Sequence, residues 1–127
     1  MTAWSRAELR TMADTAQMHV SPLRADGVSY ATPTLIWGVV VGDAVYVRGY
    51  NGQRSRWDQA ATRRKSGRLA AGGLTKEVSF APVDGPFNDR VDDAYRTKYR
   101  NSPYLAAMIS ARARSATVRV TPCQSRT

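Results

Sequence analysis

The close spacing of short strand-like segments is the feature that most constrains the fold of this chain. About six such segments, bounded by glycine-containing turns, fit within 127 residues. The helix-like segments are grouped instead of alternating with the strands, whereas a doubly wound sheet needs strict alternation. The sequence therefore predicts a single α+β domain over residues 1–127, with an antiparallel barrel or sandwich and short helices packed outside it.

Turn residues suggest how the first strands are connected. Asp26-Gly27 can supply a tight turn, which predicts a hairpin of residues 19–24 and 28–34, closed off by Pro33. The next segment, Leu35–Val41, is apolar throughout and indicates a strand buried on both faces.

Gly42-Asp43 then turns the chain into an expected strand at residues 45–50. Side chains alternate along a strand, so this segment has one core face and one aromatic, basic face. That second face is either functional or simply solvated. The core face carries Val45, Val47 and Gly49, and the other carries Tyr46, Arg48 and Tyr50.

The remaining elements follow from cap signals and periodicity. Ser5 and Glu8 form a capping-box pattern that starts a helix at about residue 6, with Trp4 and Leu9 as a hydrophobic staple. Val78 and Phe80 share the inward face of one later strand. Further strands are expected at residues 68–73, 76–83 and 116–121, and helices at 6–17, 56–64, 90–99 and 103–112.

Composition excludes several classes of site. No apolar run reaches the roughly 20 residues of a membrane span, and no signal peptide is recognisable, so we expect a cytoplasmic protein with no membrane contact. Cys123 is the single cysteine and His19 the single histidine, which predicts neither a disulfide nor a metal site. No motif identifies a catalytic residue.

The basic segment, residues 48–68, is the best candidate for a functional site. The chain has a formal net charge of +9, and this segment holds seven basic residues against one acid, Asp58. It runs from a strand through a glycine-containing loop into a helix N-terminus, where free backbone amides and the helix dipole attract anions. Arg54, Ser55 and Arg56 would flank the anion, and Gly52 would allow close approach.

A purely structural interpretation of the basic segment remains open. Ser55 can cap its helix, and Trp57 can anchor the core. Arg63, Arg64 and Lys65 suit a helix C-terminus. Outside the segment, Tyr95 and Tyr99 lie on one helix face and either pack on the sheet or cover a ligand.

Several segments that together extend over most of the chain match a known pattern: Thr34–Val41, Val45–Arg48, Gly52–Trp57, Gly67–Leu69, Gly72-Gly73, Val91–Tyr99 and Ala116–Val120. They resemble a bacterial family of unknown function, domain-of-unknown-function family 2255. That family is grouped with the FMN-binding split β-barrels, which include pyridoxamine-phosphate-oxidase-like proteins and flavin/deazaflavin oxidoreductases. The resemblance implies a split antiparallel barrel of about six strands and a homodimer.

The resemblance also implies a cofactor site. Relatives in the wider group hold the phosphate of FMN or of a deazaflavin coenzyme with the strand–loop–helix segment. Carried over to this chain, the expected cofactor-binding residues are Arg48, Tyr50, Gly52, Arg54, Ser55, Arg56 and Trp57. A hydride-transferring cofactor would suit a chain so poor in catalytic side chains, with a small organic molecule as substrate.

Two other functions compete with this one. A barrel without a cofactor could bind an apolar small molecule, which would also explain the lack of acid–base residues. A nucleic-acid-binding domain would use Tyr46, Arg48, Tyr50 and Trp57 as a basic aromatic platform, although no nucleic-acid motif is recognisable and that partner is not expected.

Overall fold

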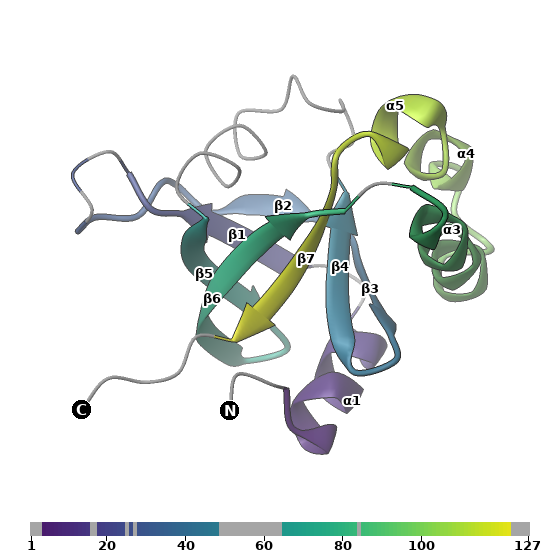
Figure 1. The fold of residues 1–127 in the computed structure, drawn as a ribbon. Helices are drawn as coiled ribbons and strands as arrows, with labels where there is room; N and C mark the ends of the chain where they lie inside the picture. The colour runs from purple at the N-terminus through teal and green to yellow at the C-terminus, as the bar shows by residue number, and fades with distance from the viewer. Residues whose placement is uncertain are drawn as a thin grey trace.

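A seven-stranded antiparallel sheet curls into a nearly closed barrel (Figure 1). The computed structural model describes residues 4–15, 18–24, 26, 28–48, 65–83 and 85–122. The order of the strands is β2-β1-β5-β6-β7-β4-β3. The predicted α+β split barrel is confirmed, with seven strands where about six were expected. The strands are β1 (Met18–Pro22), β2 (Thr34–Ile36), β3 (Gly38–Val41), β4 (Ala44–Arg48), β5 (Ser66–Ala71), β6 (Leu74–Pro82) and β7 (Thr117–Pro122).

The barrel closes through a single residue. β2 and β3 form the two edges of the sheet, yet only Trp37 separates them along the chain. The expected single strand at Leu35–Val41 is therefore wrong: the chain bends at Trp37 and continues on the opposite edge. Leu35 is 49% exposed, so the segment is not buried on both faces either.

The hairpin that follows β1 has shorter strands and a longer connection than expected. β1 pairs with β2, with His19 opposite Leu35, whereas residues 28–33 contribute only an isolated bridge between Leu23 and Tyr30. Asp26 explains the difference, because its carboxylate accepts hydrogen bonds from the amides of residues 28 and 29 and binds those donors locally. The strand begins only after Pro33, which has no amide hydrogen.

The first helix, α1 (Arg6–Asp14), follows its start signals closely. Ser5 and Glu8 form the predicted capping box. The helix ends at Asp14, earlier than expected. Just before its start, the Trp4 indole donates a hydrogen bond to the carbonyl of Val120 at 2.9 Å. This bond ties the start of the helix to β7.

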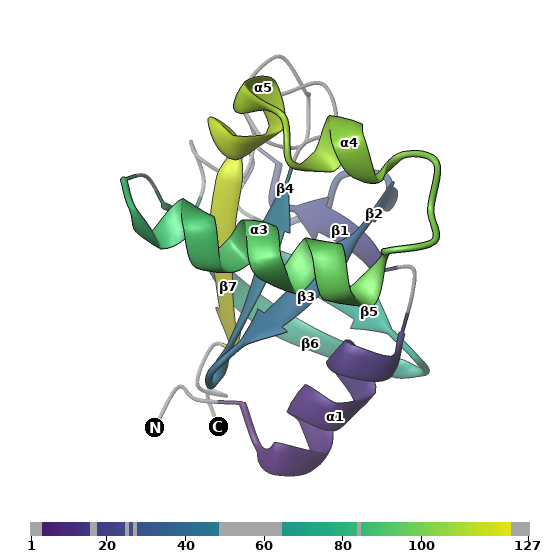
Figure 2. The same cartoon turned by 90° about the vertical axis from the view of Figure 1, so that its right-hand side faces the viewer.

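Three further helices cover one face of the barrel. They are α3 (Phe87–Lys98), α4 (Leu105–Met108) and α5 (Ala111–Arg114), and Figure 2 shows α3 lying across β3 and β4. α3 starts before the expected position. Ser110 splits the helix expected at 103–112, because its side chain caps α5. The helix expected at 56–64 lies outside the described residues. No described helix is long and apolar enough to cross a membrane.

The alternation along β4 separates two hydrophobic cores. Val45 and Val47 face the barrel interior, as predicted, with Val78 and Phe80 of β6. Tyr46 faces α3, in a second core that contains Tyr95 and Tyr99. The idea that the Tyr46 and Arg48 face is solvated is therefore wrong, since these side chains are 5% and 0% exposed.

The tyrosines of α3 pack on the sheet, as one of the two interpretations held. Tyr95 is fully buried, and its hydroxyl donates to the carbonyl of Trp37 at 2.6 Å. The Tyr99 ring stacks on the Trp37 ring with 4.7 Å between centroids. These contacts fix the bend between β2 and β3 against the helical layer.

Gly67 offers a test of how tightly the barrel is packed. A Cβ there would lie 2.6 Å from the Ser21 carbonyl oxygen and 2.8 Å from Pro22 Cα, both on the neighbouring strand. We expect Gly67→Ala to destabilise the fold by about 3 kcal/mol, because main-chain atoms must move. Urea denaturation measures the effect.

Gly73→Ala is the matched control. Gly73 has a φ of +84° but open space around its Cα, so only backbone strain of about 1 kcal/mol is expected there. Equal losses of stability at both positions would show that β1 and β5 are not packed as described.

Candidate functional site

Arg48 is the one predicted cofactor-binding residue within the described part of the chain. Its predicted companions, Tyr50, Gly52, Arg54, Ser55, Arg56 and Trp57, lie outside the described residues, and their role stays a prediction. The described residues that flank these positions are the end of β4 and the start of β5. Two features at these flanks define the candidate site.

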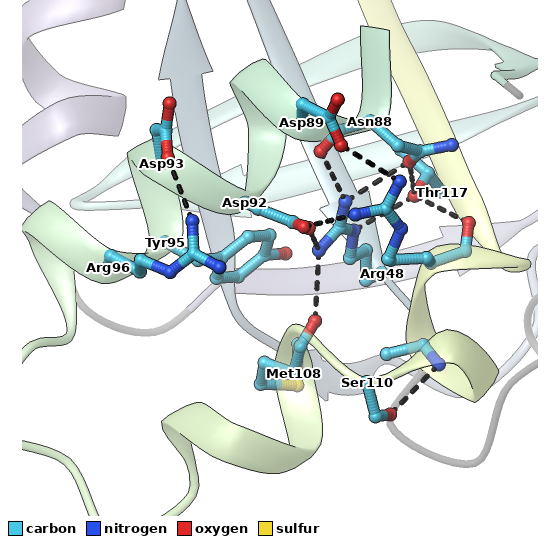
Figure 3. Close-up of polar contacts among 12 residues, drawn as sticks. Arg48, Asn88, Asp89, Asp92, Asp93, Tyr95, Arg96, Met108, Ser110 and Thr117 are labelled. Atoms are coloured by element: carbon cyan, nitrogen blue, oxygen red, sulfur yellow. Dashed lines mark hydrogen bonds and ion pairs between the residues drawn. The ribbon is translucent and has the colours of Figure 1, made fainter. Parts of the chain in front are cut away.

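The first feature is the Arg48 anchor, in which a buried guanidinium group is held on all sides (Figure 3). Its Nε donates to the Thr117 hydroxyl at 2.9 Å, and its Nη1 donates to the Met108 carbonyl at 3.0 Å. Its Nη2 donates to the backbone and side-chain oxygens of Asn88, both at 3.1 Å. All three nitrogens therefore have partners inside the protein.

Asp92 compensates the buried charge. Its Oδ1 lies 2.5 Å from Arg48 Nη1, an ion-pair contact, although this oxygen makes no hydrogen bond among the described residues. Its Oδ2 accepts a hydrogen bond from Arg114, which also pairs with Asp89 at 3.0 Å. Two arginines and two aspartates thus link β4 to α3 and α5 (Figure 3).

The Arg48 anchor fixes the point where the basic segment leaves the barrel. The guanidinium carbon also lies 5.3 Å from the centre of the Tyr95 ring. Arg48 is thus a structural anchor in the described residues, and the phosphate contact assigned to it from the sequence stays a prediction.

The second feature is the β1–β5 pocket, an open depression of about 410 Å³ on the outer face of the barrel. This volume lies within the range of small-molecule sites. The start of β5 reaches it through Arg68, the last cation of the basic segment. The pocket is lined by His19, Ser21, Arg24, Tyr30, Ala31, Thr32, Pro33, Arg68, Ala70 and Thr75.

A polar cluster forms one side of the β1–β5 pocket. Arg68 Nε donates to Glu77 at 2.6 Å, and its guanidinium carbon lies 3.9 Å from the centre of the Tyr30 ring. The Tyr30 hydroxyl donates to the other oxygen of Glu77. Arg24 Nε donates to the Tyr30 carbonyl at 3.0 Å, and Arg24 lines the same pocket as Arg68.

These contacts shift the ionisation of the polar cluster. Partial burial disfavours the charge on Glu77, but the hydrogen bonds from Tyr30 and Arg68 outweigh it and hold the pKa of Glu77 below its ordinary value. The hydrogen bond to Glu77 raises the pKa of Tyr30. The polar cluster therefore keeps a neutral Tyr30 phenol between a charged Arg68 and a charged Glu77 at neutral pH.

Sequence reasoning missed most of this pocket. The sequence placed Arg68 in the basic segment, but it predicted no functional role for Arg24 or Tyr30. They come together because β1 pairs with β5, which places Ser21 opposite Arg68. This pairing joins segments more than 40 residues apart, so no local sequence pattern predicts it.

Comparison with known proteins identifies the family. Residues 8–120 match the family model described as "Uncharacterized protein conserved in bacteria (DUF2255)". The chain belongs to this family. No curated protein matches the DUF2255 chain significantly.

A solved structure shares the fold. The conserved hypothetical protein Rv2991 from Mycobacterium tuberculosis superposes with a TM-score of 0.66 at 15% sequence identity. The alignment covers 98% of the DUF2255 chain and 83% of the other. At this identity the similarity establishes the barrel architecture alone.

Neighbouring aspartates of α3 allow a matched test of the Arg48 anchor. Asp92→Asn should cost about 3 to 5 kcal/mol, because it leaves Arg48 buried beside a neutral group. Asp93 forms only an exposed pair with Arg96, so Asp93→Asn should cost less than about 0.5 kcal/mol. Chemical denaturation of both variants measures the difference.

Proposed function

We propose that this protein binds a flavin-class coenzyme, FMN or a deazaflavin, through its basic segment and the adjoining β1–β5 pocket. The observation that carries the proposal is the continuity of the two: the segment with seven cations and one acid ends at Arg68, which lines the pocket beside Arg24. Guanidinium groups suit the phosphate of such a coenzyme, because they bind oxyanions in a bidentate manner.

The geometry of the pocket fits one part of such a ligand. Arg24 and Arg68 offer guanidinium groups, of which that of Arg68 is already paired with Glu77, while Ala31, Pro33 and Ala70 offer apolar surface. An organic molecule with an anionic tail needs both kinds of contact in one depression. The residues present are therefore compatible with a coenzyme that extends from the basic segment along β5.

The proposal extends to chemistry only through the coenzyme. When bound, a flavin or deazaflavin supplies hydride transfer, and the chain would orient a small organic substrate beside it. In that case the protein is an oxidoreductase that needs no catalytic acid or base of its own. A homodimer, implied by the family resemblance, belongs to the same proposal.

The nucleic-acid alternative has less support than the coenzyme, although Tyr50 and Trp57 of its proposed platform lie outside the described residues. It relied on Tyr46 and Arg48 as part of an aromatic, basic sheet face, and both side chains are buried beneath the helices. Stacking on bases requires accessible rings. Titration with the two coenzymes distinguishes the proposal from the remaining alternative, a barrel that binds an apolar small molecule without a coenzyme.

An absorption spectrum of the freshly purified protein, followed by titration with FMN and with a deazaflavin coenzyme, tests the proposal. The fluorescence of one coenzyme should be quenched when it binds. That coenzyme should also raise the melting temperature of the protein, because it binds only the folded state. Arg56→Ala and Arg24→Ala should each weaken binding about tenfold or more, since each removes a charge-assisted hydrogen bond.

Arg96→Ala is the control for unspecific charge effects, because Arg96 lies on α3 and pairs only with Asp93 among the described residues. The affinity of this variant for the coenzyme should equal that of the unmodified protein. A colourless protein whose melting temperature responds to neither coenzyme would contradict the proposal and leave the coenzyme-free barrel.

A further inference from the structure

A second pocket, the Lys98 pocket, lies between α1, β3 and α3 and has a volume of about 440 Å³. It is separate from the β1–β5 pocket and shares no lining residue with it. Its walls are mostly apolar, and Lys98 contributes an amine. The lining residues are Ala13, Val39, Val40, Asp93, Ala94, Thr97 and Lys98.

The hydrogen bonds of Lys98 can be made by its neutral amine as well as by its ammonium form. Its Nζ donates to the Met12 carbonyl at 2.9 Å and to the Gly38 carbonyl at 2.7 Å. A neutral amine has two N–H groups, and both then have acceptors. An ammonium group has a third N–H, for which the described residues provide no further hydrogen bond or ion pair. The remaining position of Nζ carries this third N–H in the ammonium form and the lone pair in the neutral form.

The charges around Lys98 do not offset its burial. Asp14 on α1 favours the ammonium form, and the Tyr99 ring lies 5.3 Å from Nζ. Asp93, the acid that lines the pocket, is paired with Arg96. Desolvation nevertheless dominates and lowers the pKa of Lys98 to about 8. At pH 7 roughly one tenth of the amine is then neutral, against less than about 0.1% for an ordinary lysine.

We propose that Lys98 is a nucleophilic amine and that its pocket takes a small aldehyde or ketone with an apolar substituent. The nitrogen lone pair attacks the carbonyl carbon, and a proton moves from nitrogen to oxygen to give a carbinolamine. Loss of the hydroxyl group and of the second nitrogen proton as water gives an imine. The apolar substituent packs against Val39, Val40 and Ala94.

A purely structural role for Lys98 makes the opposite prediction. As a clamp that joins α1, β3 and α3, the amine would be shielded and would react more slowly than exposed lysines. The chain provides the comparison within one molecule, because its other lysines are Lys65 and Lys76. Lys65 is exposed, and Lys76 pairs with Glu8 at the surface.

The test is reductive trapping on the full-length protein. The protein is incubated with butanal and cyanoborohydride, and each lysine is quantified by peptide mass mapping. At pH 7 we expect Lys98 to be labelled at least about tenfold faster than Lys65 and Lys76, because far more of its amine is neutral. Its labelling rate should saturate with butanal concentration, as a binding pocket requires, while the rates at the other two rise linearly.

The pH profile separates chemistry from simple access. Labelling of Lys98 should level off above about pH 8, whereas labelling of Lys65 and Lys76 should continue to rise towards about pH 10. Labelling of Lys98 no faster than the other lysines, or without saturation, would overturn the proposal. The result is independent of the flavin-class proposal, because the experiment contains no coenzyme. Lys98→Arg should abolish the fast label, and persistence of that label would also overturn the proposal.

Discussion

The buried guanidinium group of Arg48 is the constraint on which the helical layer depends. A charge removed from water must find both an opposite charge and acceptors for its hydrogens. Asp92 supplies the charge, and Asn88, Met108 and Thr117 supply the acceptors. These partners belong to three elements, so α3, the end of α4 and the start of β7 can occupy few positions relative to β4.

A second constraint acts on the barrel itself. Because β2 and β3 are its two edges and only Trp37 separates them, the barrel can close only if the chain bends at that residue. Tyr95 and Tyr99 hold the bend from the helical layer. The two constraints therefore meet on α3, which carries Asp92 towards the anchor and the tyrosines towards the bend. The β1–β5 pocket, in contrast, depends on the pairing of β1 with β5 inside the sheet.

Local signals predicted the parts of the fold that local interactions determine. The capping box at Ser5 and the turn at Gly42-Asp43 act within a few residues, and both were predicted correctly. The inward pair Val78 and Phe80 follows from strand alternation alone. The break at Trp37 and the burial of Arg48 depend on partners more than 35 residues away, and residue type gave no sign of them. An arginine next to a glycine-rich loop has the same sequence signature whether it binds a ligand or an internal aspartate.

The distinction between these two roles of arginine bears on the function of the basic segment. A coenzyme is positioned well only if the loop that holds it starts from a fixed point, since every rotamer left free lowers precision and affinity. Arg48 provides such a point because its own hydrogen bonds are all satisfied within the protein. A residue that is saturated by internal partners can thus serve binding without touching the ligand. Under the proposed function, the contacts to an anion would therefore come from the arginines beyond Arg48 and from those of the β1–β5 pocket.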